Sequence, residues 1–507
     1  MNEEAHMYRP IILSIAIMTL LAGASFGPAF AGWTDPTRLT FDDHNLEPQV
    51  VARGDTVHIA WFQQVQVQNL RFRRSTDGGV NWDSLVQLSE VGHDVMYPDL
   101  RLSPEGVFIG WADYDTASFR EFKMAYRFSP DGASWGEPIY KLIPGPYAFS
   151  YPAAASSGDT IFTAYFANAP DSTGLSPFKF IRSLDRGITW SQSLTLGYTF
   201  GSPSDVVLTY CGEVLLVVWA GVVDSNHFNQ YHVIGYRSAD AGATWSDSIW
   251  IAPDFGQISQ QPCVACDEET GQIAVGYQDD REGGPGFHGH FYMALSDDGG
   301  LSWPREVRAT TSPTAWDPAI AFVGDTLVGA WSDARHYEEG QHEIYFRRSN
   351  DGGGTWQPEE RVTASWGQGY YPSLAMDRGS IHLVWWEDLF ISPQNRYDEI
   401  FYSRYLPGTS GAIGQGNISL PSSDLLFAYP NPFNSTLQVS VMSAEDGILV
   451  IYDLQGRLIK QFEYHAGPSK IAWNGQDKNG NSLTSGVYFI KAKGGDRITT
   501  LKVVYVK

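Results

Sequence analysis

A single short motif recurs six times along this chain and constrains its fold more than any other feature. Each copy reads Ser, any residue, Asp, then Gly and Trp within a few positions, and the copies begin at Ser75, Ser129, Ser183, Ser238, Ser296 and Ser349. A motif that returns at a nearly constant spacing indicates an array of similar structural units. Asp, Ser and Gly favour tight turns and Trp buries a large ring, so the repeat predicts six similar hairpins. One catalytic site would not need six copies, which makes the motif a structural element.

The sequence around the motif repeats as four short strands. A Pro opens the first strand of each unit, at Pro48, Pro98, Pro152, Pro203, Pro262, Pro318 and Pro372. A second strand usually ends in an aromatic residue such as Trp61, a third leads into the motif, and a fourth leaves it. Four strands per unit are typical of a β-propeller blade.

The number of units predicts that the array closes into a ring. Trp33 extends the series of motif Trp residues backwards, which gives seven positions at a spacing of about 54 residues, slightly above known propeller repeats. The last unit ends at Arg404 and lacks a fourth strand, which the segment after Trp33 would supply. Pairing of the two ends removes the exposed edges of an open array. We therefore predict an all-β chain with a seven-bladed propeller at residues 32–407, closed by its N-terminal strand.

Charge and the N-terminal residues indicate an exported protein. The formal net charge is −23, which argues against a nucleic-acid partner because few basic residues are available to neutralise phosphates. The apolar run Ile11–Ala22 is too short to span a bilayer, and small residues follow it at Ala29 and Ala31. We expect residues 1–31 to be a signal peptide and the mature chain to keep no membrane segment.

The three cysteines, Cys211, Cys263 and Cys266, are an odd number and do not form a disulfide framework. Cys263 and Cys266 have the spacing of a metal or redox pair. They fall in a predicted strand, however, where positions three apart point to opposite faces and cannot share one metal or one bridge. We expect ordinary buried thiols and no bound metal.

The repeated units resemble the Asp-box, or BNR, repeats of bacterial sialidases and related secreted propellers. The resemblance covers most of the chain and implies an extracellular glycan or glycoprotein as partner, hydrolysis of a glycosidic bond as reaction, and no cofactor. It also implies that the motif turns lie on the face opposite the ligand. The chain departs from the sialidases, which have six blades and a Phe/Tyr-Arg-Ile-Pro signature that is absent around Arg38. A glycan- or protein-binding propeller without catalysis and a polysaccharide lyase are the alternatives.

Polar and aromatic residues in the loops opposite the motif turns are the candidate functional residues. Paired carboxylates can act as acid and base or as nucleophile on a glycosidic bond, and Arg can hold an acidic sugar. The catalytic candidates are Asp280, Arg281, Asp333, Arg335, Glu387 and Asp388. The substrate-binding candidates are Asp99, Arg101, Asp113, His336, Trp316, Tyr370 and Tyr371. Further loop residues of these types are Tyr97, Tyr147, Tyr151, Asp115, Asp224, His227, His288 and His290.

Two interpretations of the charged candidates stay open at this point. Neighbouring acidic and basic residues, namely Asp280 with Arg281 and Asp333 with Arg335, also fit ion pairs that brace the loops from blade to blade. Asp99 and Arg101 occupy inner-strand positions that are mostly small in the other units. They therefore predict either a pair that faces the central channel or a closed ion pair.

The composition changes after the last propeller unit. Residues 408–424 are rich in Gly, Ser and Pro, which is typical of a linker. Residues 425–507 predict a small Ig-like β-sandwich. Its segments 428–434, 450–457, 473–480 and 485–491 resemble the C-terminal sorting domain of type IX secretion cargo. That resemblance implies contact with the type IX secretion machinery and release outside the cell or attachment to its surface.

Overall fold

The protein is described by a computed structural model whose regular elements are all β-strands. The described residues are 32–34, 36–41, 44–64, 67–103, 105–115, 122–143, 149–167, 175–223, 230–252, 258–282, 289–336, 341–363, 367–392, 395–406, 425–429, 433–443, 445–465, 467–495 and 497–507. Within these ranges no helix is long and apolar enough to span a bilayer. The predicted signal peptide and linker lie outside them. The chain divides into two compact units, one within Ala29–Pro421 and the other within Ser422–Lys507.

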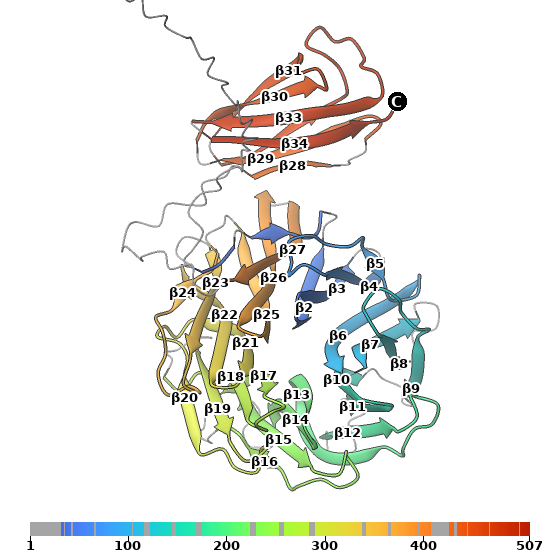
Figure 1. The fold of residues 1–507 in the computed structure, drawn as a ribbon, viewed down its shortest axis with the longest axis vertical. Helices are drawn as coiled ribbons and strands as arrows, with labels where there is room; N and C mark the ends of the chain where they lie inside the picture. Colours follow the sequence, from blue (N-terminus) through green and yellow to red (C-terminus); the bar gives the residue numbers. More distant parts are fainter. Residues whose placement is uncertain are drawn as a thin grey trace, which may run out of the picture. The chain divides into compact units, whose positions relative to one another are not determined.

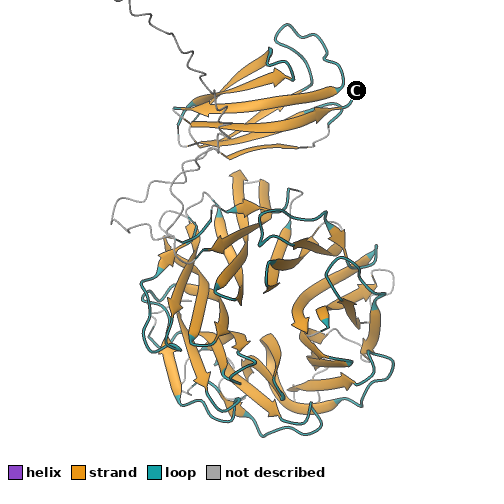
Figure 2. Ribbon diagram, in the orientation of Figure 1, coloured by secondary structure: helices purple, strands orange, loops and turns teal. Residues whose placement is uncertain are grey.

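The described part of the first unit contains six sheets, and every strand pair in them is antiparallel (Figures 1 and 2). Four sheets have four strands in chain order. The first three of them are β2 (Asn45–Arg53), β3 (Thr56–Gln64), β4 (Gln68–Ser75) and β5 (Val86–Gln87); β6 (His93–Ser103), β7 (Gly106–Asp115), β8 (Phe122–Ser129) and β9 (Ile139–Ile143); and β17 (Ser259–Cys266), β18 (Ile273–Asp279), β19 (His290–Ser296) and β20 (Arg305–Arg308). The other four-stranded sheets are β21 (Ala315–Val323), β22 (Thr326–His336), β23 (Gln341–Ser349) and β24 (Glu360–Arg361); and β25 (Gln368–Asp377), β26 (Ser380–Ser392) and β27 (Asn395–Tyr405) with β1 (Thr37–Arg38).

The sixth sheet has seven strands, which are β10 (Phe149–Ser157), β11 (Thr160–Ala167), β12 (Leu175–Ser183), β13 (Leu194–Cys211), β14 (Val214–Val222), β15 (His232–Ser238) and β16 (Ile249–Trp250). β13 runs for 18 residues, and its first part pairs with β12 while its second part pairs with β14. The sheet is therefore two four-strand groups that share β13. The prediction that a Pro opens each first strand is wrong in detail, because all seven Pro residues lie inside their strands, and Pro203 lies in the middle of the continuous β13.

The first strands of the groups follow one another around a ring (Figure 1). Neighbours in this series contact each other in the order β2, β6, β10, β13, β17, β21 and β25, and β25 contacts β2 again. The N-terminal strand completes the last group, because β1 pairs with β27 through Thr37 opposite Tyr402 and Arg38 opposite Phe401. The N-terminal strand β1 is thus the fourth strand of the sheet that contains β25, β26 and β27.

The motif turns, defined as the turns that follow Ser75, Ser129, Ser183, Ser238, Ser296 and Ser349, all lie at one end of the strands. Each turn touches the turn between the first and second strands of its own group, as where the amide of Gly352 donates to the carbonyl of Asp325 at 2.8 Å. Inside the turn, Ser349 Oγ accepts from the amide of Gly353 at 2.8 Å and donates to Asp351 at 2.7 Å. The shorter copy at Ser129 keeps a similar pattern, with Gly132 donating at 2.7 Å.

The motif Trp residues join each sheet to the one before it. The ring of Trp135 lies 4.9 Å from that of Phe72 in the preceding group, and Trp245 lies 4.8 Å from Phe180. Trp82 stacks edge-on against Tyr402 at 5.0 Å, across the junction of first and last groups. The repeated Trp therefore belongs to the packing between sheets, which agrees with its predicted structural role.

The second unit consists of two sheets around a common core. One sheet contains β28 (Leu425–Tyr429), β29 (Leu437–Ser443) and β32 (Gly467–Trp473). The other contains β31 (Leu458–Tyr464), β30 (Gly447–Asp453), β33 (Gly486–Gly494) and β34 (Arg497–Tyr505). Trp473 is fully buried between Phe433 and Tyr488, and residues of both sheets belong to one hydrophobic cluster.

Candidate functional site

Each first strand of the ring carries a β-bulge near its beginning, at the end opposite the motif turns. In β21 the pairing with β22 shifts between Trp316 and Ala319, and Asp317 lies at the shift with a φ of 49°. The residues in this position with positive φ, called the bulge residues below, are Glu47, Tyr97, Asp205, Gln261, Asp317 and Tyr371. None is Gly, so each costs about 1 kcal/mol or more of backbone strain. A bulge redirects side chains, and here it repeats around the centre of the ring.

Five of the bulge residues line one cavity, called the central pocket below. It has a volume of about 330 Å³, within the range of small-ligand sites. The lining residues are Glu47, Phe62, Met96, Tyr97, Asp205, Gln260, Gln261 and Tyr371. Tyr371 is 42 % exposed, and its ring is stacked with that of Trp386, with 6.5 Å between the ring centres. The pocket thus combines carboxylates, amides and aromatic rings from strands that are far apart in the sequence.

Hydrogen bonds connect consecutive bulge residues around part of the ring. Gln261 donates from Nε2 to Asp317 Oδ1 at 2.7 Å, and its Oε1 accepts from the amide of Asp317 at 3.1 Å. The amide of Tyr371 in turn donates to Asp317 Oδ2 at 3.4 Å. Asp317 is therefore held between its two neighbours in the ring, beside the lining of the central pocket.

The three bulge carboxyl groups have raised pKa values. Burial, followed by the charges of Asp205 and Asp317, raises the pKa of Glu47 to about 7. Burial raises the pKa of Asp317 to about 7, and the charge of Asp205 acts in the same direction. Burial also raises the pKa of Asp205 to about 6. With these pKa values the three carboxyl groups are not all ionised near neutral pH. Protonated and ionised carboxyl groups therefore coexist in one site.

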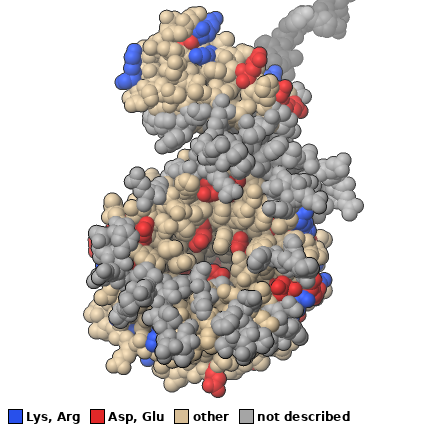
Figure 3. Space-filling model, turned by 180° about the vertical axis from the view of Figure 1, so that it is seen from behind, with Lys and Arg blue, Asp and Glu red and all other residues tan. Residues whose placement is uncertain are grey.

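The described lining of the central pocket contains acidic residues and neither Lys nor Arg. In Figure 3 acidic groups gather around the hollow in the middle of the ring. Like charges without a cation make the pocket unfavourable for an anionic sugar and favourable for a neutral or cationic one. The described residues also contain no group of three or more His, Cys, Asp or Glu side chains placed to hold a metal ion.

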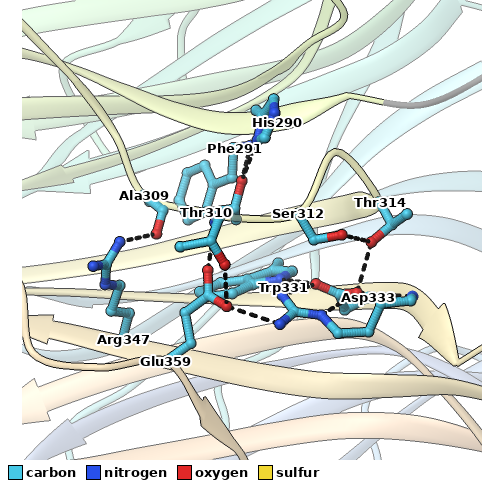
Figure 4. A network of polar contacts seen from close by, with 12 residues as sticks. His290, Phe291, Ala309, Thr310, Ser312, Thr314, Trp331, Asp333, Arg347 and Glu359 are labelled. Atoms are coloured by element: carbon cyan, nitrogen blue, oxygen red, sulfur yellow. Dashed lines mark hydrogen bonds and ion pairs between the residues drawn. The ribbon is translucent and has the colours of Figure 1, made fainter. Parts of the chain in front are cut away.

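The predicted catalytic residues Asp333 and Arg335 lie in a closed polar network (Figure 4). Asp333 is fully buried and accepts from Arg335 at 2.7 Å, from Trp331 at 2.8 Å and from Thr314 at 2.7 Å. Arg335 also donates to Glu359 at 2.9 Å. The side chains of both candidates form their hydrogen bonds with other residues of the protein. This favours the interpretation that they brace the loops over one in which they contact substrate.

A second network repeats this arrangement in the preceding sheet. Arg281 pairs with Asp279 at 2.7 Å and with Glu306 at 2.8 Å, and its guanidinium lies 4.3 Å from the ring centre of Tyr292. The predicted partner, Asp280, instead accepts from the amide of Ile258 at 2.8 Å. The expected pairing of Asp280 with Arg281 is therefore wrong by one residue.

The remaining acidic candidates are buried and hydrogen-bonded. Asp113 is fully buried and accepts from Trp111 at 3.1 Å and contacts His93 at 2.6 Å. Glu387 accepts from Trp385 at 3.3 Å and, like Asp388, is buried. Asp113 on β7 and Glu387 on β26 each accept from the buried Trp two residues earlier in the second strand of their group, which is typical of a repeated structural contact.

Asp99 and Arg101 form an ion pair at 2.7 Å on β6, as the second of the two predicted possibilities. Asp99 is buried and accepts from the amide of Ala154 on β10 at 2.9 Å, which ties two neighbouring first strands together. The pair therefore contributes to contact between groups.

The aromatic candidates divide between the central pocket and its surroundings. Tyr371 and Tyr97 line the central pocket. Tyr370 packs beside Trp386, with 4.8 Å between ring centres, and Trp316 precedes the bulge residue Asp317 on β21. Tyr147, Asp224, His227 and His288 lie outside the described residues, as do the side chains of Asp115, Tyr151 and His336.

Sequence reasoning missed the three bulge carboxyl groups. Glu47 and Asp317 each stand directly before the Pro that opens a first strand, and so do Tyr97, Gln261 and Tyr371. A polar or aromatic residue before the same Pro in successive units was the available signal. Asp205 does not share this signal, because it lies two residues after Pro203 and the other bulge residues lie directly before a Pro.

Comparison with protein families identifies the C-terminal region. Residues 428–507 match the secretion system C-terminal sorting domain. The match confirms the predicted sorting domain and indicates type IX secretion to the cell surface or the exterior. It also supports contact with the type IX secretion machinery. None of the curated proteins compared with the sequence matches it.

Several solved structures are similar to the chain at low sequence identity. The α-L-arabinofuranosidase Arb93A of Fusarium graminearum is 15 % identical, with 61 % of this chain and 92 % of that chain covered and a TM-score of 0.42. The phage phi92 endosialidase is 10 % identical, with 94 % and 87 % covered and a TM-score of 0.47. An ulvan lyase of polysaccharide lyase family 25 is 9 % identical, with 71 % and 93 % covered and a TM-score of 0.48. The activities in these names belong to those proteins.

Proposed function

We propose that this protein is a secreted seven-bladed propeller that hydrolyses glycosidic bonds of extracellular glycans in its central pocket. The observation that carries the proposal is the ring of bulge residues, where six non-Gly residues hold strained backbone conformations and three carry carboxyl groups with raised pKa values. Strain that recurs at one position in a cavity is a recognised mark of functional sites. Carboxyl groups whose pKa values reach the working pH are another.

The chemistry follows from the protonation states in the pocket. A glycosidase needs one protonated carboxyl to donate to the leaving oxygen and one carboxylate to act as base or nucleophile. With pKa values of about 7, Glu47 and Asp317 are partly protonated at neutral pH, while Asp205 at about 6 is mostly ionised. The proposed roles are therefore general acid for Glu47 or Asp317 and base or nucleophile for Asp205. The exposed ring of Tyr371 offers a surface on which a sugar stacks.

The charge of the pocket selects the class of glycan. Because its described lining holds acidic residues and no cation, we propose neutral or amino-bearing sugars as substrates. The proposed substrates therefore differ from those of the sialidases that the repeats resemble, because sialidase substrates are acidic. The Arg residues that could have served an acidic sugar, Arg281 and Arg335, are paired with buried carboxylates.

The same proposal covers the arrangement of the whole chain. We propose a signal peptide at residues 1–31, the propeller at 32–407, a linker at 408–424 and an Ig-like sorting domain at 425–507. We assign the network of Asp333 with Arg335 and the buried carboxylates Glu387 and Asp388 to bracing of the propeller loops. The closed order of first strands and the sheet completed by β1 support the seven-bladed ring.

The test is incubation of the full secreted chain with neutral, amino-bearing and carboxylated polysaccharides, followed by measurement of new reducing ends. We expect reducing ends from the first two classes only. Glu47→Gln and Asp317→Asn should lower kcat/KM by about 10²- to 10⁴-fold, the usual contribution of a general acid or base. Glu105→Gln, an exposed residue in the turn between β6 and β7 at the opposite end of the strands, is the matched control.

Three outcomes would contradict the proposal. Retention of a glycan without cleavage would indicate a binding propeller. Unsaturated products would indicate a lyase. Cleavage of carboxylated glycans alone, unaffected by Glu47→Gln and Asp317→Asn, would place the chemistry outside the central pocket.

A further inference from the structure

Two of the three cysteines lie at the ends of neighbouring first strands. Cys211 is the last residue of β13 and Cys266 the last residue of β17, and these strands contact each other in the ring. Cys211 Sγ donates to the carbonyl of Asp267, the residue after Cys266, at 3.6 Å. On the same pair of strands, Thr209 Oγ1 of β13 lies 4.0 Å from Cys266 Sγ of β17. The ends of the two strands are thus in contact at the positions of the two thiols.

The thiols share one apolar environment. Cys211 is 3 % exposed and belongs to a hydrophobic cluster against which Cys266 packs. A hydrogen bond with the Cys266 side chain, followed by burial, raises the pKa of the Cys211 thiol. Cys263 packs against a different cluster, as expected for a residue three positions from Cys266 in a strand.

We propose that Cys211 and Cys266 form a disulfide in the exported protein and that Cys263 stays a free thiol. All three residues are thiols in this structure, so the bond requires an oxidising compartment. The C-terminal sorting domain indicates export, and exported bacterial proteins pass through the periplasm, where disulfides form and persist. The proposed bond departs from the sequence-based expectation of ordinary buried thiols, which rested on an odd count and on the spacing of Cys263 and Cys266.

The reaction is a thiol–disulfide exchange with a periplasmic oxidoreductase that carries a reactive disulfide. The half-buried Cys266 is the more accessible thiol, and its thiolate attacks one sulfur of the oxidoreductase and displaces the other as a thiolate. Cys211 then loses its proton and attacks Cys266 Sγ, which breaks the mixed disulfide. The products are one protein disulfide and one oxidoreductase dithiol, so two electrons and two protons pass to the oxidoreductase.

The bond would fasten two neighbouring groups of the ring at their motif-turn ends. A covalent link between sequence-distant residues stabilises a fold mainly by restricting the unfolded chain. β13 is also the strand that two groups share, so the link joins this shared strand to the next group. Reduction should therefore lower the melting temperature of the propeller by several degrees.

The test is intact mass spectrometry of the full chain, exported to the periplasm, unfolded in guanidinium and alkylated with or without prior reduction. We expect one alkyl group without reduction and three after it. Cys263→Ser should show none and then two, whereas Cys211→Ser should show two under both conditions. Reductant should lower the melting temperature of the wild type and of Cys263→Ser and leave that of Cys211→Ser unchanged.

Three alkyl groups on the exported, unreduced wild type would overturn the inference. A disulfide that persists in Cys211→Ser would also overturn it, because the bond would then involve Cys263. The wild-type measurement does not depend on whether any variant folds. Failure of the proposed glycosidase activity would leave these masses unchanged, so the two proposals can be judged separately.

Discussion

Carboxyl groups lie at both ends of the strands of the first unit, and their pKa values are shifted in opposite directions at the two ends. At the motif-turn end, hydrogen bonds from the residue four positions later lower the pKa of four Asp residues to about 2, namely Asp77, Asp240, Asp298 and Asp351. At the bulge end, burial raises the pKa of Glu47 and Asp317 to about 7 and that of Asp205 to about 6. The difference arises from the environment, since the chemical group is the same.

This contrast separates structural from functional carboxylates within one repeat. A motif-turn Asp has its oxygens filled by donors of its own turn, so its charge is satisfied where it stands. A bulge carboxyl lies near other acids in a half-buried pocket, so its charge is costly and its proton is available. Repetition therefore does not identify function here. The pKa direction distinguishes the two ends.

The largest effect should come from exchanging one carboxyl at each end for its amide. Asp317→Asn removes a proton-transfer group and should lower kcat/KM by about 10²- to 10⁴-fold without lowering the melting temperature. Asp351→Asn should lower the melting temperature and leave kcat/KM unchanged, because the turn stands far from the pocket. Glycan hydrolysis assays and thermal unfolding of both variants check this. The comparison breaks if Asp351→Asn is the variant that loses activity.

The pH dependence of stability should show opposite slopes for the two ends. The motif-turn Asp residues bind protons more weakly in the folded state, so stability rises with pH between about 2 and 4. The bulge carboxyls bind protons more tightly in the folded state, so stability falls as pH increases from about 4 to about 7. The contribution of these groups to stability should therefore be greatest near pH 4. Melting temperatures measured across this pH range check it.

Single substitutions test which end of the strands causes each part of the pH dependence of stability. Asp317→Asn should flatten the fall between pH 4 and 7, and Asp351→Asn should flatten the rise between pH 2 and 4. Gln261→Glu places a further acid beside Asp317 and should steepen the fall. If Asp317→Asn instead changed the acidic limb, the assignment of the raised pKa to the bulge would be wrong.

The local chemistry of the sequence was sufficient to predict the repeated strands and the closure by the N-terminal segment. Each motif turn is built from residues within five positions, as where Ser349 bonds to Asp351 and Gly353. Such contacts need no knowledge of the rest of the chain. The completion of the last sheet by β1 followed from a missing strand, which a count of units reveals.

The central pocket could not be predicted in the same way, because it exists only after the ring closes. Glu47 and Asp317 stand in different groups, and the Pro that follows each of them marks a recurring strand position but does not show that these positions meet at one cavity. Sequence adjacency instead directed attention to Asp333 and Arg335, which pair with each other because they are close along the chain. Adjacent opposite charges indicate ion pairs, whereas a shared pocket requires positions that become neighbours in three dimensions.

A smaller effect should follow from removing the buried hydroxyl of one motif turn. Ser349 is fully buried, and its Oγ accepts from the amide of Gly353 at 2.8 Å. Ser349→Ala leaves that amide without its acceptor and should lower the free energy of unfolding by about 1–3 kcal/mol. Ser302→Ala, which removes an exposed hydroxyl bonded to Asp298, is the control and should cost less. Denaturant unfolding compares them, and equal losses would contradict the structural role of the buried Ser.

The smallest effect concerns backbone conformation at one position of the motif turn. Ala241 adopts a φ of 52° where the equivalent residue of the next copy is Gly299, with a φ of 67°. A left-handed conformation costs a non-Gly residue about 1–2 kcal/mol, and the greater freedom of unfolded Gly offsets part of that gain. Ala241→Gly should therefore raise the free energy of unfolding by about 0.5–1 kcal/mol, and Gly299→Ala should lower it by a similar amount. A Cβ on Gly299 would meet Val214 at 3.4 Å, an ordinary contact, so the pair isolates the backbone term. Unchanged activity in both variants would sharpen the contrast, because strain at this end would then affect stability alone while strain at the bulge end accompanies function.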